Sequence, residues 1–342
     1  MTHETRAKRP PGAKRMPEGV ESSPERGQPR GPSIGAWSIW SAVLFGAAVL
    51  LGGFLLYQTL SRYEFSEVSA AIFAVSPWRL MSACAFAAAS YICLTGFDWL
   101  ALRYVGYPLS YRRAALASFT ALSLGHNIGF AALSSGAVRY RFYSRWGLGT
   151  FEVAKVILFC GITVGLGLAS LGGLAVLLQP RLAAQITGLQ PMYVIYLGAA
   201  CLAAPVTYLA AAAGGLQRLR FRQWSLEMPS LRLALGQILL GTLNFTFVAA
   251  CLHQALNAIS PVPYPAAATV YVIANTATLI SHVPGGLGVV ESTVLFLLPG
   301  QSSIAAVLIF RAVYFFLPLC FGLSAFVLSE LRLRGRAART AT

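Results

Sequence analysis

The sequence predicts an all-α polytopic membrane protein with about six full spans and two re-entrant helical hairpins, arranged as an inverted-topology repeat. Three observations predict this class. Hydrophobic residues make up 56% of the chain and charged residues only 11%, a balance typical of membrane proteins. The apolar residues gather in runs long enough to cross a bilayer core of ~30 Å at ~1.5 Å per residue. Glycine and proline interrupt two further apolar regions, where a continuous helix is not expected.

The runs follow one another in a regular order along the chain. Residues 1–36, rich in proline and in charges of both signs, are expected to form a disordered cytoplasmic tail. The transmembrane domain is expected at 37–330, with repeat halves at 37–178 and 191–328, followed by a basic cytoplasmic tail at 331–342. The predicted full spans are 37–60, 77–102, 151–178, 191–213, 232–254 and 302–328. The predicted hairpins are 114–136 and 265–299.

Basic residues orient these segments. The chain has 26 Lys and Arg against 11 Asp and Glu, an excess that nucleic-acid-binding proteins also show. Here the basic residues flank the ends of apolar runs, which favours membrane orientation and anionic headgroups as partners over nucleic acid. Both basic clusters around 114–136 stay in the cytoplasm if this region is re-entrant, and a full span is the alternative. We expect an integral protein of the bacterial inner membrane with both termini in the cytoplasm.

The second predicted hairpin breaks at Ser281–Glu291, which contains one proline and three glycines. Non-helical backbone at membrane depth persists only where protein buries it or where it lines a wet cavity. His282 would end one half-helix, and Glu291 would lie in the first turn of the next. Both charges suit the dipoles of those helix ends.

The pattern Pro-Gly-Gly-Leu-Gly-x-x-Glu in this stretch resembles the membrane domain shared by lysylphosphatidylglycerol synthase/flippase proteins and their stand-alone relatives. The resemblance covers residues 37–330 and includes a looser N…G…R element in the first half. It implies a domain that binds phospholipid-like substrates and moves them between leaflets. The aminoacyl-transferase domain of full-length members is not expected here, so we expect no enzyme activity. The positions that the resemblance implicates are Asn127, Gly136, Arg139, Pro284, Gly285, Gly286, Gly288, Glu291 and Arg311.

Ionisable residues at membrane depth are costly and by default indicate function. Arg311 lies well inside the last predicted span and needs a partner, and Glu291 is the nearest candidate in the sequence. The two residues either form a structural pair that pins the hairpin or contact the substrate, and both roles are compatible. Asp98 lies near the cytoplasmic end of its span, where an ion pair with Arg103 and a headgroup contact are both open.

Two other charged residues, Glu152 and Lys155, lie three apart and share one helix face. They are candidates for substrate contact. The alternative for Glu152 is that it complements the helix dipole, with Thr150 as the N-cap. Both interpretations stay open on the sequence alone.

The predicted hairpin tips carry three polar residues, His126 and Asn127 in the first and His282 in the second. They could bind a metal only if the tips met. No carboxylate or cysteine spacing supports a metal site, so we expect polar tip residues that contact substrate or satisfy the backbone. No nucleotide fingerprint or other cofactor motif occurs, and none is expected.

After the first tip, Arg139, Arg141 and Arg145 alternate with aromatic residues. Arginine binds phosphate through its planar fork, and aromatic rings favour headgroup depth. This pattern predicts a ledge for lipid phosphate, with an ordinary positive-inside loop as the alternative.

The favoured function is transport of a phospholipid or related lipid through a midplane polar cavity between the tips. One alternative is a non-transporting scaffold or regulator that binds an envelope-lipid enzyme. Another is an ion-coupled transporter of small solutes. The chain could also pair with further copies of itself as a homo-oligomer.

Overall fold

The computed structural model describes Phe73 and residues 75–128, 131–214, 218–221, 224–297 and 302–339. All of them belong to one compact unit, Ala48–Thr342. The predicted tail 1–36 and the predicted span 37–60 lie outside the described residues.

Five helical segments of the described chain are long and apolar enough to cross a membrane. They are α3 (Pro77–Tyr104), α6 (Thr150–Leu178), α8 (Pro191–Ala213), α9 (Leu231–Asn257) and the continuous segment Ala305–Leu331. Each coincides with one of the spans predicted from the apolar runs. The prediction of an all-α polytopic membrane protein is therefore confirmed.

The last of these segments is not a regular α-helix throughout. It comprises α12 (Ser302–Arg311), a π-helical turn η2 (Ala312–Phe316) and α13 (Leu317–Arg339). A π-turn shifts the hydrogen-bond register, and such turns occur frequently at functional sites. Helix α13 continues through Arg339, into the segment predicted as a basic tail.

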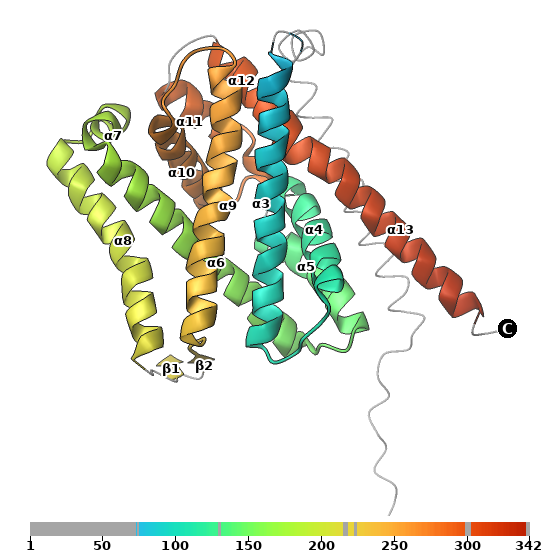
Figure 1. Cartoon of the computed structure of the whole chain (residues 1–342). Helices are drawn as coiled ribbons and strands as arrows, with labels where there is room; N and C mark the ends of the chain where they lie inside the picture. The colour runs from blue at the N-terminus through green and yellow to red at the C-terminus, as the bar shows by residue number, and fades with distance from the viewer. Residues whose placement is uncertain are drawn as a thin grey trace, which may run out of the picture. The chain divides into compact units, whose positions relative to one another are not determined.

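Helices α3 and α9 form an antiparallel pair at the centre of the described chain (Figure 1). Gly96 of α3 lies against Leu240, whereas Leu100, one turn further, lies against Gly236. Helix α6 crosses α9 where Gly167 meets Gly241, and a Cβ on either glycine would collide with the backbone of the other helix. Small residues at such crossings let membrane helices approach closely.

A helical hairpin follows each member of this central pair. Helices α4 (Tyr111–Ile128) and α5 (Ala131–Arg145) come after α3, whereas α10 (Tyr264–Ser281), η1 (Pro284–Gly286) and α11 (Val289–Leu297) come after α9. Because α3 and α9 are antiparallel, the hairpins enter from opposite ends of the pair (Figure 1). An inverted repeat requires this arrangement. The repeat itself stays a prediction, because 37–60 is not described.

The first hairpin is longer than the predicted 114–136. Its helices pack side by side, with the Ser134 hydroxyl 3.5 Å from the Gly125 carbonyl oxygen that accepts its hydrogen bond. A Cβ on Gly125 would lie 2.8 Å from the Ser135 Cβ, so glycine permits this approach. Helix α5 extends past the predicted end to Arg145, because no glycine or proline interrupts residues 137–145.

Two short elements were not predicted. Helix α7 (Pro180–Thr187) follows α6 and buries Ala183 and Ala184 against Val194 of α8. Strands β1 (Arg218–Phe221) and β2 (Trp224–Glu227) form an antiparallel ribbon between α8 and α9. Helix α7 is shorter than the ~11–18 residues over which a helical period is recognised, and the strands of four residues are at the short limit of a recognisable alternation, which is why the sequence does not predict them.

Candidate functional site

Four charged residues of the described chain are buried, with at most 8% of the surface of each residue exposed: Asp98, Arg139, Glu291 and Arg311. They form two carboxylate–guanidinium pairs, one beside each hairpin. A buried charge at membrane depth must be paired to be tolerated. The two pairs are therefore the first candidates for functional groups.

The pair beside the second hairpin joins Glu291 of α11 to Arg311, the last residue of α12. Arg311 Nε donates to Glu291 Oε1, and Arg311 Nη2 donates to Oε2 at 2.8 Å. Arg311 Nη1 and Nη2 also donate to the carbonyl oxygens of Gly285 and Gly286, at 2.9 and 3.0 Å. Arg311 thus makes four hydrogen bonds and ties the Pro-Gly loop to the last span.

The loop geometry explains why glycines stand here. Gly285, Gly286 and Gly288 all have positive φ, between 59° and 79°, a region that glycine adopts without steric cost. The turn between Pro284 and Gly288 directs the first two glycine carbonyls toward Arg311 and the Gly288 N–H toward Glu291 Oε2, at 2.9 Å. The loop and the ion pair are therefore one unit, the tip clamp.

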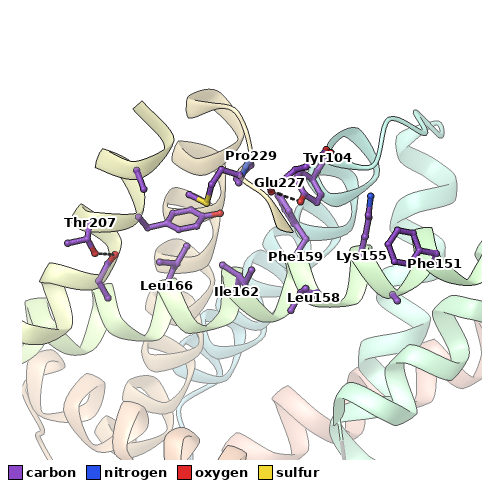
Figure 2. A pocket seen from close by; sticks show the side chains of 15 residues that line it. Tyr104, Phe151, Lys155, Leu158, Phe159, Ile162, Leu166, Thr207, Glu227 and Pro229 are labelled. Carbon is purple, nitrogen blue, oxygen red and sulfur yellow. Dashed lines mark hydrogen bonds between the residues drawn. The ribbon is translucent and has the colours of Figure 1, made fainter. Parts of the chain in front are cut away.

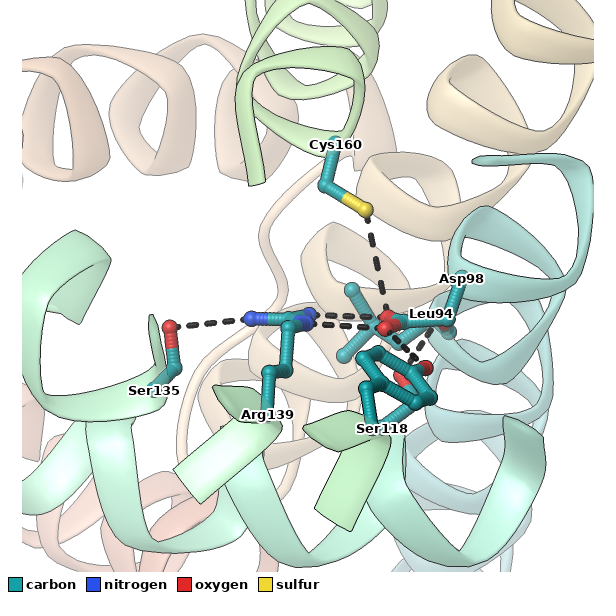
Figure 3. A network of polar contacts seen from close by, with 7 residues as sticks. Leu94, Asp98, Ser118, Ser135, Arg139 and Cys160 are labelled. Atoms are coloured by element: carbon teal, nitrogen blue, oxygen red, sulfur yellow. Dashed lines mark hydrogen bonds and ion pairs between the residues drawn. The ribbon is translucent and has the colours of Figure 1, made fainter. Parts of the chain in front are cut away.

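The pair beside the first hairpin joins Asp98 of α3 to Arg139 of α5 (Figure 3). Arg139 Nε and Nη2 donate to Asp98 Oδ1 and Oδ2, both at 2.8 Å. The Tyr143 hydroxyl donates to Oδ1 at 2.7 Å, and Arg139 Nη1 donates to the Ser135 hydroxyl at 3.0 Å. The Cys160 thiol lies 3.9 Å from Oδ2.

This geometry corrects the expected partner of Asp98. Arg103 lies five residues later on the same helix and faces another side. Its guanidinium stacks over the Trp99 ring, 3.7 Å from the centroid. The sequence could not show that Arg139, 41 residues away, comes back to the same helix face as Asp98.

The three arginines predicted to form a ledge after the first tip have different partners in the structure. Arg139 is buried with Asp98, whereas Arg141 and Arg145 both pair with Glu330 of α13, with closest distances of 2.7 Å. Two residues along a helix turn a side chain by about 200°, so Arg139 and Arg141 face different neighbours.

Gly136 lies on α5 against Ile157, whose Cδ1 would be 3.0 Å from an added Cβ.

The two tips meet in the structure. A Cβ on Gly285 would lie 3.7 Å from the carbonyl oxygen of His126 and 3.8 Å from that of Asn127. Asn127 Nδ2 donates to the Ser123 carbonyl oxygen at 2.9 Å and to the Phe315 carbonyl oxygen at 3.4 Å. The first tip therefore contacts both the Pro-Gly loop and the π-turn that follows Arg311.

Aromatic rings pack around this meeting point. The His126 ring stacks on Tyr314, with centroids 6.2 Å apart, and meets Tyr91 edge-on. His126 Nδ1 is buried and has no hydrogen-bond partner in the described part of the chain. His282 is exposed at the C-cap of α10, where its φ is 54° and Nδ1 lies 2.8 Å from the Ile280 carbonyl oxygen. The two histidines thus occupy different environments.

Among the described residues, no group of three His, Cys, Asp or Glu side chains could hold a metal ion. At the tips, where the sequence predicts a polar cavity, the rings of Tyr91, His126 and Tyr314 pack against one another. A cavity of about 450 Å³ lies elsewhere, between α6 and α8 (Figure 2). The sequence reasoning missed it, although apolar residues repeat at helical spacing on both helices.

Lys155 lines this cavity, and its Nζ lies 4.8 Å from the centroid of the Phe151 ring. Glu152 does not line it. Its carboxylate folds back over Gly149, the observed N-cap of α6, so closely that a Cβ there would collide with it. Thr150 was the predicted N-cap, and it is instead the first residue of the helix. The position of Glu152 suits the helix dipole.

Comparison with known proteins identifies relatives along most of the chain. Residues 40–322 match the family model described as the lysylphosphatidylglycerol synthase TM region. The "Uncharacterized protein slr0712" of Synechocystis sp. is 31% identical over 76% of this chain and 82% of its own. The "Inner membrane protein YbhN" of Escherichia coli is 29% identical over 86% of this chain and 94% of its own.

Proposed function

The chain belongs to the family of the lysylphosphatidylglycerol synthase transmembrane region, and from this premise we propose that it moves a phospholipid or related lipid between the two leaflets of a membrane. Family membership and five candidate spans make it an integral membrane protein related to lipid handling. Transport is the finer step that we add. The observation that carries it is the contact between two broken hairpins that enter from opposite ends.

Broken helices that meet near the midplane form the substrate sites of many secondary transporters. In this chain the contact is made by backbone and aromatic rings, and one buried arginine–carboxylate pair lies beside each hairpin. The first hairpin is also tied to α13 through Arg141, Arg145 and Glu330. A hairpin tied to its neighbours by a few polar contacts is a discrete unit that can move when those contacts open. We propose that separation of the tips opens a polar path for the headgroup while the acyl chains stay in lipid.

The tip clamp fits the chemistry of such a path. Arginine offers a planar fork that binds carboxylate and phosphate in the same bidentate manner. A lipid phosphate entering between the tips can therefore replace Glu291 or the loop carbonyls as the partner of Arg311. Such an exchange keeps the arginine paired throughout, which avoids the cost of a bare charge at membrane depth.

We also propose the orientation. The relative from Escherichia coli is named as an inner membrane protein, and we place this chain in the corresponding membrane. The end of α3 where the first hairpin enters carries three arginines, Arg103, Arg112 and Arg113. The positive-inside tendency assigns that end to the cytoplasm. Both termini would then be cytoplasmic.

The experiment is lipid translocation in vesicles that contain the purified protein. A phosphatidylglycerol labelled with a fluorophore on one acyl chain is placed in both leaflets, and an impermeant quencher bleaches the outer one. With translocation, the quencher removes nearly all fluorescence rather than about half. Recovery of the labelled lipid without covalent change would fit a transporter that moves the lipid and does not modify it. A quenched fraction equal to that of protein-free vesicles, with correctly folded protein present, would overturn the proposal.

A further inference from the structure

The cavity between α6 and α8 is an elongated groove between two membrane helices. Its lining residues on α6 run from Phe151 to Leu166, which spans ~22 Å at 1.5 Å per residue. On α8 they recur at helical spacing, from Ala204 to Ala211. The volume of about 450 Å³ lies within the ~300–1,000 Å³ usual for small-molecule sites.

The groove lies at the periphery of the described chain. Helix α8 is the least buried of the five candidate spans, with only 17% of its apolar window inside the protein. A groove on this side of α6 therefore faces the lipid phase, where an acyl chain is the abundant apolar ligand. The ribbon of β1 and β2 and the segment after it close one end, where Glu227, Met228 and Pro229 contribute to the lining.

The polar groups along the groove wall are engaged within the protein. The Tyr208 hydroxyl donates to Gln237 Oε1 at 2.6 Å, and the Tyr104 hydroxyl donates to the Glu227 carbonyl oxygen at 2.6 Å. The Thr207 hydroxyl donates to the Ala203 carbonyl oxygen at 2.8 Å. The wall is thus apolar in effect over most of its length, as an acyl chain requires.

Charge is concentrated at one end of the groove. Lys155 lies within the first two turns of α6 and projects toward the side on which Tyr104 and Glu227 lie (Figure 2). Among the ion pairs of the described residues, none includes Lys155, which contacts the ring of Phe151. Lys155 therefore supplies a cation to this end of the groove, where Glu227 is the one carboxylate among the lining residues.

We propose that this groove binds an anionic glycerophospholipid, with one acyl chain between α6 and α8 and its phosphate at Lys155. The ligand matches both properties of the site, because it joins an apolar chain to a negative group at its headgroup end. The site is separate from the tip clamp and shares no residue with it. The inference does not depend on transport, since it concerns equilibrium binding.

Native mass spectrometry of the protein released from nanodiscs tests this assignment. The nanodiscs contain equal amounts of phosphatidylglycerol and phosphatidylethanolamine, so the mass of the retained lipid reveals which headgroup the protein prefers. Lys155→Gln removes the charge at similar side-chain length, and Ala204→Trp fills the groove. The matched controls are Arg113→Gln, a cation outside the groove, and Ala203→Trp on the neighbouring position of α8, which does not line it.

We expect the wild type and both controls to retain phosphatidylglycerol selectively. Lys155→Gln should lower its retention roughly tenfold, as expected for loss of one charge-assisted contact, and Ala204→Trp should abolish it. Equal retention in all five proteins, or equal retention of both lipids by the wild type, would overturn the proposal and indicate annular lipid only. Because the readout is binding, failure to retain phosphatidylglycerol would overturn the groove proposal and leave the transport proposal standing. A loss of transport with normal lipid retention would leave the groove proposal standing.

Discussion

Arg311 and Glu291 form a buried ion pair in which the same guanidinium also holds two glycine carbonyl oxygens of a broken helix. The pair therefore fixes backbone as well as side chains. Helix α11, the Pro-Gly loop and the last span meet at one arginine, and the opposite hairpin rests on the loop. This relationship determines what each of the following variants should do.

Glu291→Ala should destabilise the protein strongly. Removing one partner of a buried ion pair leaves an uncompensated charge and typically costs about 3–5 kcal/mol. The double variant Glu291→Ala/Arg311→Met should lose less than the two single losses combined, because no bare charge remains. Thermal unfolding of the four proteins in one detergent measures the coupling. Strictly additive losses would mean that the two side chains do not act as a pair.

The first pair should behave in the same way, with a graded control. Asp98→Ala leaves Arg139 without its carboxylate and should cost about 3–5 kcal/mol. Tyr143→Phe removes one of the hydrogen bonds to Asp98 and should cost about 1–2 kcal/mol. Denaturant or thermal unfolding ranks the variants. A Tyr143→Phe loss as large as that of Asp98→Ala would contradict the geometry.

The loop glycines should differ in their tolerance to alanine. Gly286 and Gly288 both have positive φ, but a Cβ on Gly286 would lie 2.7 Å from the Thr278 hydroxyl, whereas nothing lies within 4 Å at Gly288. Gly288→Ala should show backbone strain alone, about 1–3 kcal/mol, and Gly286→Ala should lose more. Equal losses of thermal stability in the two variants would show that the close contact with Thr278 does not add to the cost of the Gly286→Ala substitution.

The crossing of α6 and α9 offers a second matched comparison on one helix. Gly167→Ala would push a methyl group into the backbone of α9 at Gly241, whereas nothing lies within 4 Å of a Cβ on Gly161. Gly161→Ala should be neutral or stabilising by up to about 1 kcal/mol, since alanine favours the helix. Gly167→Ala should lower the unfolding temperature markedly. A harmless Gly167→Ala would indicate that the helices separate without cost.

Hydrophobic runs and helix breakers predicted the five spans that the structure describes and the second hairpin, because length and composition dominate in a bilayer. They also identified Glu291 and Arg311, because few charges lie at membrane depth. The first hairpin was predicted from the placement of basic residues around 114–136. The pairs Asp98–Arg139 and Arg141–Glu330 were missed, since each joins residues far apart in the sequence. Which face of α5 meets which neighbour is a tertiary property that the sequence pattern does not contain.

The elements around the groove were missed for a related reason. Helix α7 has eight residues and each strand of the β1–β2 ribbon has four. Helix α7 is shorter than the ~11–18-residue window in which a helical hydrophobic period is recognised, and the strands are at the short limit of a recognisable alternation. Lys155 was named for its spacing from Glu152, but its role in lining a cavity depends on how α8 packs against α6. The pairing of helices determines cavities, and the sequence of one helix does not specify its partner.

The most direct test of the account is the translocation rate of Arg311→Ala in vesicles, measured beside the wild type at equal incorporation. Arg113→Ala, which removes a cation outside both ion pairs, is the control for net charge. The account predicts that the wild type and Arg113→Ala move the labelled phosphatidylglycerol into the quenched leaflet, while folded Arg311→Ala does not. Wild-type rates in Arg311→Ala would contradict the assignment of transport to the tip clamp.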